Sequence, residues 1–150
     1  EIMPSLVGSE MCIRDRFVRD LHGVLYYNDS KATNPDAAIR GIGSMNRKTL
    51  LIGGGYDKNL EFDAWIESFD GKVKCLLLIG QTKDKIAVCA RKHGFENIVC
   101  CDTLNEAVNI CYRLAKPGEA VLLSPACASW GQFDNYEQRG DMFKEYVKAL

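Results

Sequence analysis

Short apolar runs alternate with longer amphipathic segments from residue 17 to the end of the chain, and this alternation constrains the fold more than any other feature. The apolar runs cover residues 24–28, 49–53, 75–79, 97–101 and 120–124. The amphipathic segments cover residues 35–44, 62–69, 83–93, 104–114 and 140–150. Such a pattern predicts βα units, and the central runs lack the alternating polar residues of strands that face water. We therefore expect an α/β fold, a Rossmann-like, doubly wound, mostly parallel sheet of about five to six strands with helices on both faces.

The ends of the predicted helices carry recognisable capping residues. Asn34 followed by Pro35 is typical of a helix start, and Thr103 with Glu106 three positions later predicts a capping box. Gly94 follows a basic last turn, as a residue just after a helix does.

Residues 1–16 (EIMPSLVGSEMCIRDR) show neither helical nor strand periodicity. A cloning scar, a read-through product or a disordered linker would each have this character, so we leave the segment out of the fold prediction. We assign residues 17–150 to one domain, because a chain of 150 residues with 47% hydrophobic residues can bury one sizeable core.

Composition excludes several classes of protein. The 19 Lys and Arg residues nearly balance 20 Asp and Glu residues, so no strong charge favours nucleic acid or an anionic membrane. No apolar run approaches the ~20 residues of a membrane span, and no signal-peptide pattern opens the chain. The seven cysteines are odd in number, and Cys75, Cys89 and Cys111 lie in apolar runs as small hydrophobic residues do. We expect a protein of a reducing cytoplasm.

Ligands of such sheets bind outside the carboxyl ends of the strands, so the loops after the strands are the candidate site. The loop 28–34 precedes a helix N-terminus, which favours anions. Its Asp, Ser, Thr and Asn residues also suit ordinary capping, and Lys31 is the residue that capping does not explain.

Three glycines at positions 53–55 precede Lys58 in the second loop. They allow close approach of a ligand to the backbone, and Lys58 could bind a carboxylate or phosphate. A tight turn with a solvated lysine is the alternative interpretation. The patterns G-x-x-x-x-G-K-[ST] and G-x-G-x-x-G are both missing, so nucleotide binding does not follow from these glycines.

The third loop, 124–130, offers small residues followed by Ser129 and Trp130. Cys127 is a poor candidate nucleophile, because His22 and His93 are the chain's two histidines and both are predicted at the surface, away from this loop. No pair of carboxylates is placed for acid–base chemistry, and no Cys or His spacing matches a zinc site. The residues alone therefore predict a binding crevice and no catalytic residue.

The segments NDSKATNPDAA, LIGGGYDKNLEF and LLSPACASWGQFDNYEQRG, in this order, resemble the C-terminal domain of the Mur ligases. The likeness covers roughly residues 17–150, and its Asp-Ser-Lys-Ala-Thr-Asn loop is similar to that of the D-glutamate-adding branch. Trp130 stands where many relatives have a smaller aliphatic residue, and MCIRDR replaces the His-Arg pair expected before Phe17.

The resemblance implies an ATP-dependent ligase that joins D-glutamate to UDP-N-acetylmuramoyl-L-alanine through an acyl phosphate, with Mg²⁺ neutralising the phosphates. In that family a central domain binds ATP and Mg²⁺ and an N-terminal domain binds the uridine nucleotide. Neither domain is expected in this chain, so we expect an inactive, monomeric fragment of a bacterial cytoplasmic enzyme that packs against the missing central domain.

The same resemblance implies which residues hold D-glutamate. Six positions should surround its two carboxylates: Lys31, Thr33, Lys58, Ser129, Trp130 and Tyr136. Asp29 should instead face the ATP, near its ribose. Two alternatives remain open: another amide ligase of the superfamily, such as a folate-polyglutamate or tripeptide-adding enzyme, and a stand-alone Rossmann-like binding module.

Overall fold

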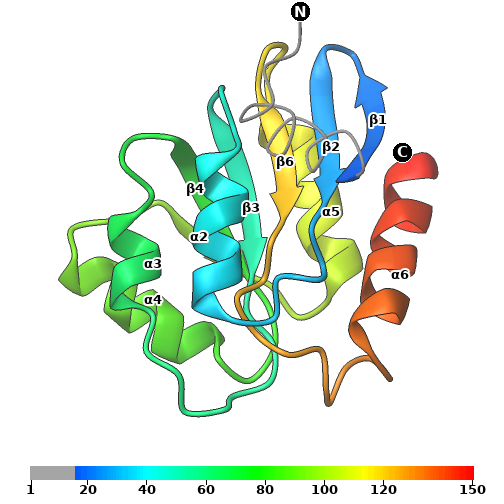
Figure 1. Cartoon of the computed structure of the whole chain (residues 1–150). Helices are drawn as coiled ribbons and strands as arrows, with labels where there is room; N and C mark the ends of the chain where they lie inside the picture. Colours follow the sequence, from blue (N-terminus) through cyan, green and yellow to red (C-terminus); the bar gives the residue numbers. More distant parts are fainter. Residues whose placement is uncertain (1–15) are drawn as a thin grey trace, which may run out of the picture.

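The computed structural model describes residues 16–150, which form one six-stranded sheet in the order β1-β2-β6-β3-β4-β5 (Figure 1). β2, β6, β3, β4 and β5 run parallel, and β1 is antiparallel to β2. The strands are β1 (Phe17–Leu21), β2 (Val24–Asn28), β3 (Thr49–Gly53), β4 (Val73–Leu78), β5 (Ile98–Cys100) and β6 (Ala120–Leu123). The α/β, mostly parallel fold predicted from the alternating pattern is confirmed.

Helices cover both faces of this sheet. They are α2 (Pro35–Gly43), α3 (Asp63–Glu67), α4 (Lys83–Lys92), α5 (Leu104–Leu114) and α6 (Tyr136–Lys148). In Figure 1, α2 lies in front of the sheet and α5 behind it. Buried residues of α2, α3 and α4 form one hydrophobic cluster, and those of α5 and α6 form a second.

Alternate residues of the central strands enter different clusters. In β3, Leu51 packs in the first cluster, while Leu50 and Ile52 pack in the second. All five residues of β3 are buried, which explains why its sequence is apolar without alternation. The two cores therefore share one sheet, as a doubly wound fold requires.

β1 is the strand that the sequence pattern did not predict. It joins β2 through His22 and Gly23, which both have positive φ, 54° and 82°. Leu21 pairs with Val24 across this two-residue turn. Positive φ at both positions suits the twist of a hairpin, but His-Gly is not among the common sequences for such a turn, so the hairpin was overlooked.

Helix boundaries agree closely with the predicted ones except at the last helix. The predicted N-caps are confirmed: Asn34 Oδ1 accepts from the Ala37 N–H at 2.9 Å, and Thr103 Oγ1 accepts from the Glu106 N–H at 3.0 Å. The reciprocal bond of the predicted capping box is shifted by one residue, because the Glu106 carboxylate accepts from the Asp102 N–H at 2.7 Å. The last helix begins at Tyr136, not at residue 140, because Asn135 caps it by accepting from the Gln138 N–H. Within residues 16–150, no helix combines the length and the apolar character needed to cross a membrane.

Candidate functional site

Three loops that follow β2, β3 and β6 meet at the carboxyl edge of the sheet. The loop after β6 lies between the other two and bonds to both. The Gly54 N–H donates to the Pro125 carbonyl and the Tyr56 N–H to the Ala128 carbonyl, each at 2.9 Å. On the other side, the Ala126 N–H donates to the Ala32 carbonyl at 3.0 Å. The predicted crevice loops are therefore one connected surface.

In the loop after β2, Lys31 is exposed and Thr33 is half-buried. Asp29 is only 4% exposed, and its Oδ2 accepts a hydrogen bond from Ser124 Oγ at 3.0 Å. Its Oδ1 lies 2.6 Å from Nε of Arg16. Asp29 as placed is thus engaged with protein donors, and a nucleotide contact at this residue stays a prediction. Arg16 belongs to the segment that the prediction set aside, and the rest of that segment lies outside the described residues.

Lys58 from the second loop lies over the Trp130 ring of the third loop, with Nζ 4.3 Å from the ring centroid. Tyr56 packs edge-on against the same indole, with ring centroids 5.3 Å apart. Trp130 is still 52% exposed, and its neighbour Ser129 is buried. Because an ammonium over an indole face is attracted by the ring quadrupole, Trp130 holds the exposed Lys58 head at the boundary between these two loops.

Tyr136 opens α6 and is linked to the first loop. Its backbone carbonyl accepts from Ser30 Oγ at 2.7 Å, while its side chain stays half-buried. Of the predicted residues, Lys58 and Trp130 are thus in direct contact. Lys31 and Tyr136 are connected only through the intervening Ser30.

Arg139 was not among the predicted site residues, yet it joins two of the loops. It is 1% exposed. Nε donates to Ser30 Oγ at 2.8 Å and NH2 to the Ser30 carbonyl at 2.7 Å, while NH1 donates to the Cys127 carbonyl at 3.0 Å. Burial lowers the pKa of Arg139 to about 10, so the guanidinium remains protonated at neutral pH. An arginine in a polar sequence segment predicts a solvated charge, which is why the pattern gave no signal for it.

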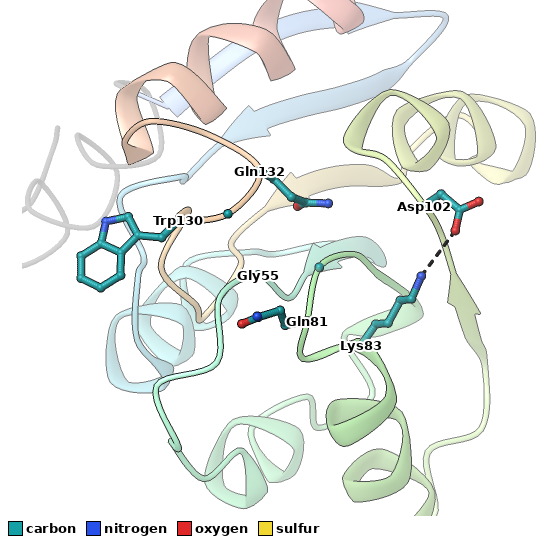
Figure 2. A pocket seen from close by; sticks show the side chains of 8 residues that line it. Gly55, Gln81, Lys83, Asp102, Trp130 and Gln132 are labelled. Atoms are coloured by element: carbon teal, nitrogen blue, oxygen red, sulfur yellow. Dashed lines mark hydrogen bonds and ion pairs between the residues drawn. The ribbon is translucent and has the colours of Figure 1, made fainter.

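A pocket of about 340 Å³ lies beside the three loops (Figure 2). Its lining consists of Gly55, Gly80, Gln81, Lys83, Asp102, Trp130, Gly131 and Gln132. Lys83 Nζ lies 3.4 Å from Asp102 Oδ1. In Figure 2 this ion pair lies at one end of the view and Trp130 at the other. Of the predicted site residues, Trp130 alone lines this pocket, so the remaining ones lie outside it.

Cys127 is not arranged as a nucleophile. The thiol is 1% exposed, and burial raises its pKa to about 11. Its Sγ lies 3.5 Å from Thr82 Oγ1. A thiol held neutral within a packed core is inert, which agrees with the rejection of a catalytic Cys127 from sequence.

Asp63, Cys89 and His93 form a cluster whose ligand-type atoms all lie within 4.8 Å of one another. Sequence spacing did not predict it, because Asp63 comes from α3 and the other two from the α4 region. His93 Nε2 is 2.7 Å from Asp63 Oδ1, and the Lys92 ammonium is 3.7 Å from the same oxygen. The carboxylate therefore already has cationic and hydrogen-bonding partners from the protein itself.

Comparison with known proteins gives a consistent family. Residues 14–127 match the family model described as Mur ligase, glutamate ligase domain. The chain is 58% identical over 137 residues to the UDP-N-acetylmuramoylalanine--D-glutamate ligase of Lachnoclostridium phytofermentans, which covers 91% of this chain and 30% of that relative. The corresponding protein of Caldicellulosiruptor saccharolyticus is 45% identical and covers 100% of this chain and 34% of the relative. The chain thus spans about a third of the length of these curated relatives.

Solved structures share the fold at low identity. A murein peptide ligase from Psychrobacter arcticus has a TM-score of 0.61 at 10% identity, over 92% of this chain and 30% of that one. Folylpolyglutamate synthase from Mycobacterium tuberculosis, solved with ADP and AMPPCP, has a TM-score of 0.61 at 13% identity, over 87% and 32%. These likenesses show the fold alone, and it is the match over residues 14–127 that shows that the chain belongs to the Mur ligase, glutamate ligase domain family.

Proposed function

We propose that this chain is the amino-acid-binding domain of a bacterial cytoplasmic ligase that joins D-glutamate to UDP-N-acetylmuramoyl-L-alanine. The observation that supports the proposal is that the loops carrying two exposed lysines, Lys31 and Lys58, both bond to the loop that leads to Ser129 and Trp130 at one edge of the sheet. D-Glutamate carries two carboxylates, and charge-assisted bonds from two separated cations suit such a ligand. The names of the relatives support the same substrate.

The role of the domain in this proposal is positioning. Lys31 and Thr33 would contact the ligand from the first loop, Lys58 from the second, Ser129 and Trp130 from the third, and Tyr136 from the start of α6. Holding the amine of D-glutamate against an activated carboxylate converts an encounter of two molecules into a reaction within one complex. The exposure of Lys31, Lys58 and Trp130 supports a site that is completed when another domain closes over this surface.

Activation of the acceptor carboxylate would use ATP with Mg²⁺, and this chain does not fit the task of holding the triphosphate. The printed sequence has no G-x-x-x-x-G-K-[ST] loop, and Asp29 is buried and already bonded. We therefore assign ATP and Mg²⁺ mainly to other parts of the full-length enzyme, and we expect the domain alone to be inactive.

Charge removal at the two lysines tests the proposal in the full-length enzyme that carries this domain. Lys31→Ala and Lys58→Ala should each raise the KM for D-glutamate by about 10-fold or more, because a hydrogen bond to a charged group contributes about 1.5–3 kcal/mol. The KM for ATP should stay within about twofold, since neither lysine is assigned to ATP. The measurement is phosphate release as a function of D-glutamate concentration.

Lys116→Ala is the matched control, because Lys116 is exposed and precedes β6, at the opposite edge of the sheet. It should leave all the constants unchanged. The assignment of the two lysines fails if their variants behave like this control. A wild-type enzyme that releases phosphate with another amino acid but not with D-glutamate would instead indicate a different amide ligase of the family.

A further inference from the structure

The guanidinium of Arg139 is a buried cation without a carboxylate partner among residues 16–150. Its three hydrogen-bond acceptors are a hydroxyl and two backbone carbonyls, all of them neutral. Transferring an ion from water into a protein interior costs several kcal/mol, and nearby opposite charge is the usual compensation. A neutral side chain of similar volume would pack at less cost, so the retained charge calls for an explanation beyond packing.

The position of Arg139 suggests that explanation, because it contacts the bases of the candidate loops. Its bonds to Ser30 fix the residue directly before Lys31. Its bond to the Cys127 carbonyl fixes the loop that continues to Ser129. The second loop also passes close by: a Cβ built on Gly55 would lie 3.5 Å from NH1 of Arg139.

A second link reinforces this arrangement. Ser30 Oγ accepts from Arg139 and donates to the Tyr136 carbonyl at 2.7 Å, so one hydroxyl connects the first loop to the first turn of α6. Gly140 is packed against the same loop, since an added Cβ would lie 2.7 Å from Nδ2 of Asn28. The start of α6 and the loop after β2 are therefore held against each other by both bonds and packing.

We infer that Arg139 is a positioning residue for a dianionic amino acid, one that fixes the spacing of the Lys31 and Ser129 loops and adds its uncompensated positive charge beneath the crevice. The inference rests on the proposed function. A buried charge is screened less than an exposed one, so its field reaches a ligand that it does not touch. Arg139 thereby favours the doubly charged ligand while Lys31 and Lys58 make the contacts.

Two substitutions in the full-length enzyme separate geometry from charge. Arg139→Met removes both the charge and the three hydrogen bonds, and should raise the KM for D-glutamate about 10-fold or more, with kcat and the KM for ATP changed less than about threefold. Arg139→Lys keeps a charge but lacks the planar fork that reaches three acceptors, and should give an intermediate increase in this KM. Arg113→Met, at an exposed position on α5, is the matched control and should change nothing.

A merely structural role would not produce this split, because a loosened fold lowers kcat and weakens the binding of every substrate. Circular dichroism and thermal melting establish whether Arg139→Met folds. If it does not fold, the KM for D-glutamate is measured instead in Arg139→Lys and in Ser30→Ala. Ser30→Ala removes one acceptor of Arg139 and leaves the charge, and both variants should raise this KM. If Arg139→Met folds and its KM for D-glutamate is unchanged, the inference is overturned. If Arg139→Met is unfolded, an unchanged KM for D-glutamate in both Arg139→Lys and Ser30→Ala overturns it.

The failure of this inference is distinguishable from failure of the proposed function. A wild-type enzyme without D-glutamate-dependent phosphate release rejects the function itself. An active wild type whose Lys31 and Lys58 variants lose affinity for D-glutamate, while the Arg139 variants do not, rejects only the role of Arg139.

Discussion

At Gly54 the absence of a side chain is a structural requirement. The backbone adopts φ +97°, and an added Cβ would lie 2.2 Å from the carbonyl oxygen of Ile79. The Gly54 N–H also bonds to Pro125, so this close approach holds the second loop between the ends of β4 and β6. The three successive glycines predicted close backbone approach, and at Gly54 the approaching group is the protein's own backbone.

Gly54→Ala should destabilise the protein by about 2–3 kcal/mol or more, because it combines positive φ with a clash against backbone. Gly43→Ala is the matched control. Nothing lies within 4 Å of a Cβ at Gly43, which is exposed at the end of α2, so this change should be neutral or stabilising by up to about 1 kcal/mol. Urea unfolding of both variants measures the difference, and equal midpoints would contradict the expectation.

Residue types alone left Lys31 unexplained by capping and made Lys58 a candidate anion contact, but they could not identify Arg139. An arginine in the polar segment 132–139 looks like a surface residue. Its burial depends on Ser30 and Cys127, which lie in other loops. Nor does local sequence show that Ser124 would bond to Asp29, since β2 and β6 are 95 residues apart at this contact.

At the scale of helices and strands, periodicity predicted the parallel strands and α5 within a residue or two. It failed where tertiary contacts define an element. β1 is half-exposed at the sheet edge and depends on the His22–Gly23 turn, and α6 starts with a polar turn whose burial comes from the loop after β2. Periodicity also could not predict the contact between α3 and α4, because Asp63 and His93 come together only when the two helices pack.

The α3–α4 contact should make stability depend on pH in the acid range. The hydrogen bond with His93 lowers the pKa of Asp63 from its usual value of 3.8. A lowered folded-state pKa means that the carboxylate contributes stability above about pH 4, and that this contribution is lost as the pH falls through the lowered value. Asp63→Asn should therefore reduce the urea midpoint at about pH 6, and the difference from wild type should disappear once the pH has fallen below the lowered pKa of Asp63.

Asp141→Asn serves as the control for that experiment. Asp141 is 73% exposed and pairs with Lys144 at 3.5 Å, and an exposed pair of this kind contributes little. If the urea midpoints of Asp63→Asn and wild type still differ at the lowest pH, the substitution acts through packing and not through the carboxylate charge.

For the molecule as a whole, coverage of both sheet faces determines which thiols react. Cys75, Cys101 and Cys111 are buried in the second cluster, and burial raises the pKa of Cys101 to about 11 and that of Cys111 well above 9. Cys100 is exposed at the end of β5. The prediction that Cys75 and Cys111 act as small hydrophobic residues is confirmed, while Cys89 is only half-buried.

Iodoacetamide should therefore modify Cys100 first among the cysteines of residues 16–150 in the native protein, and all of them after unfolding in urea. Peptide mass spectrometry over time measures the order, and Cys100→Ser should remove the fast site in this part of the chain. Modification of Cys111 as fast as that of Cys100 under native conditions would mean that α5 does not stay packed on the sheet.

The strand order has a consequence for how the domain is made. β6, formed by residues 120–123, lies between β2 and β3, which precede it by many residues. While the ribosome is still synthesising α5, the centre of the sheet is therefore missing and the facing edges of β2 and β3 have no partner. Unpaired strand edges of this kind invite association with other chains, so a nascent chain completes this sheet, and loses that hazard, only after β6 has emerged.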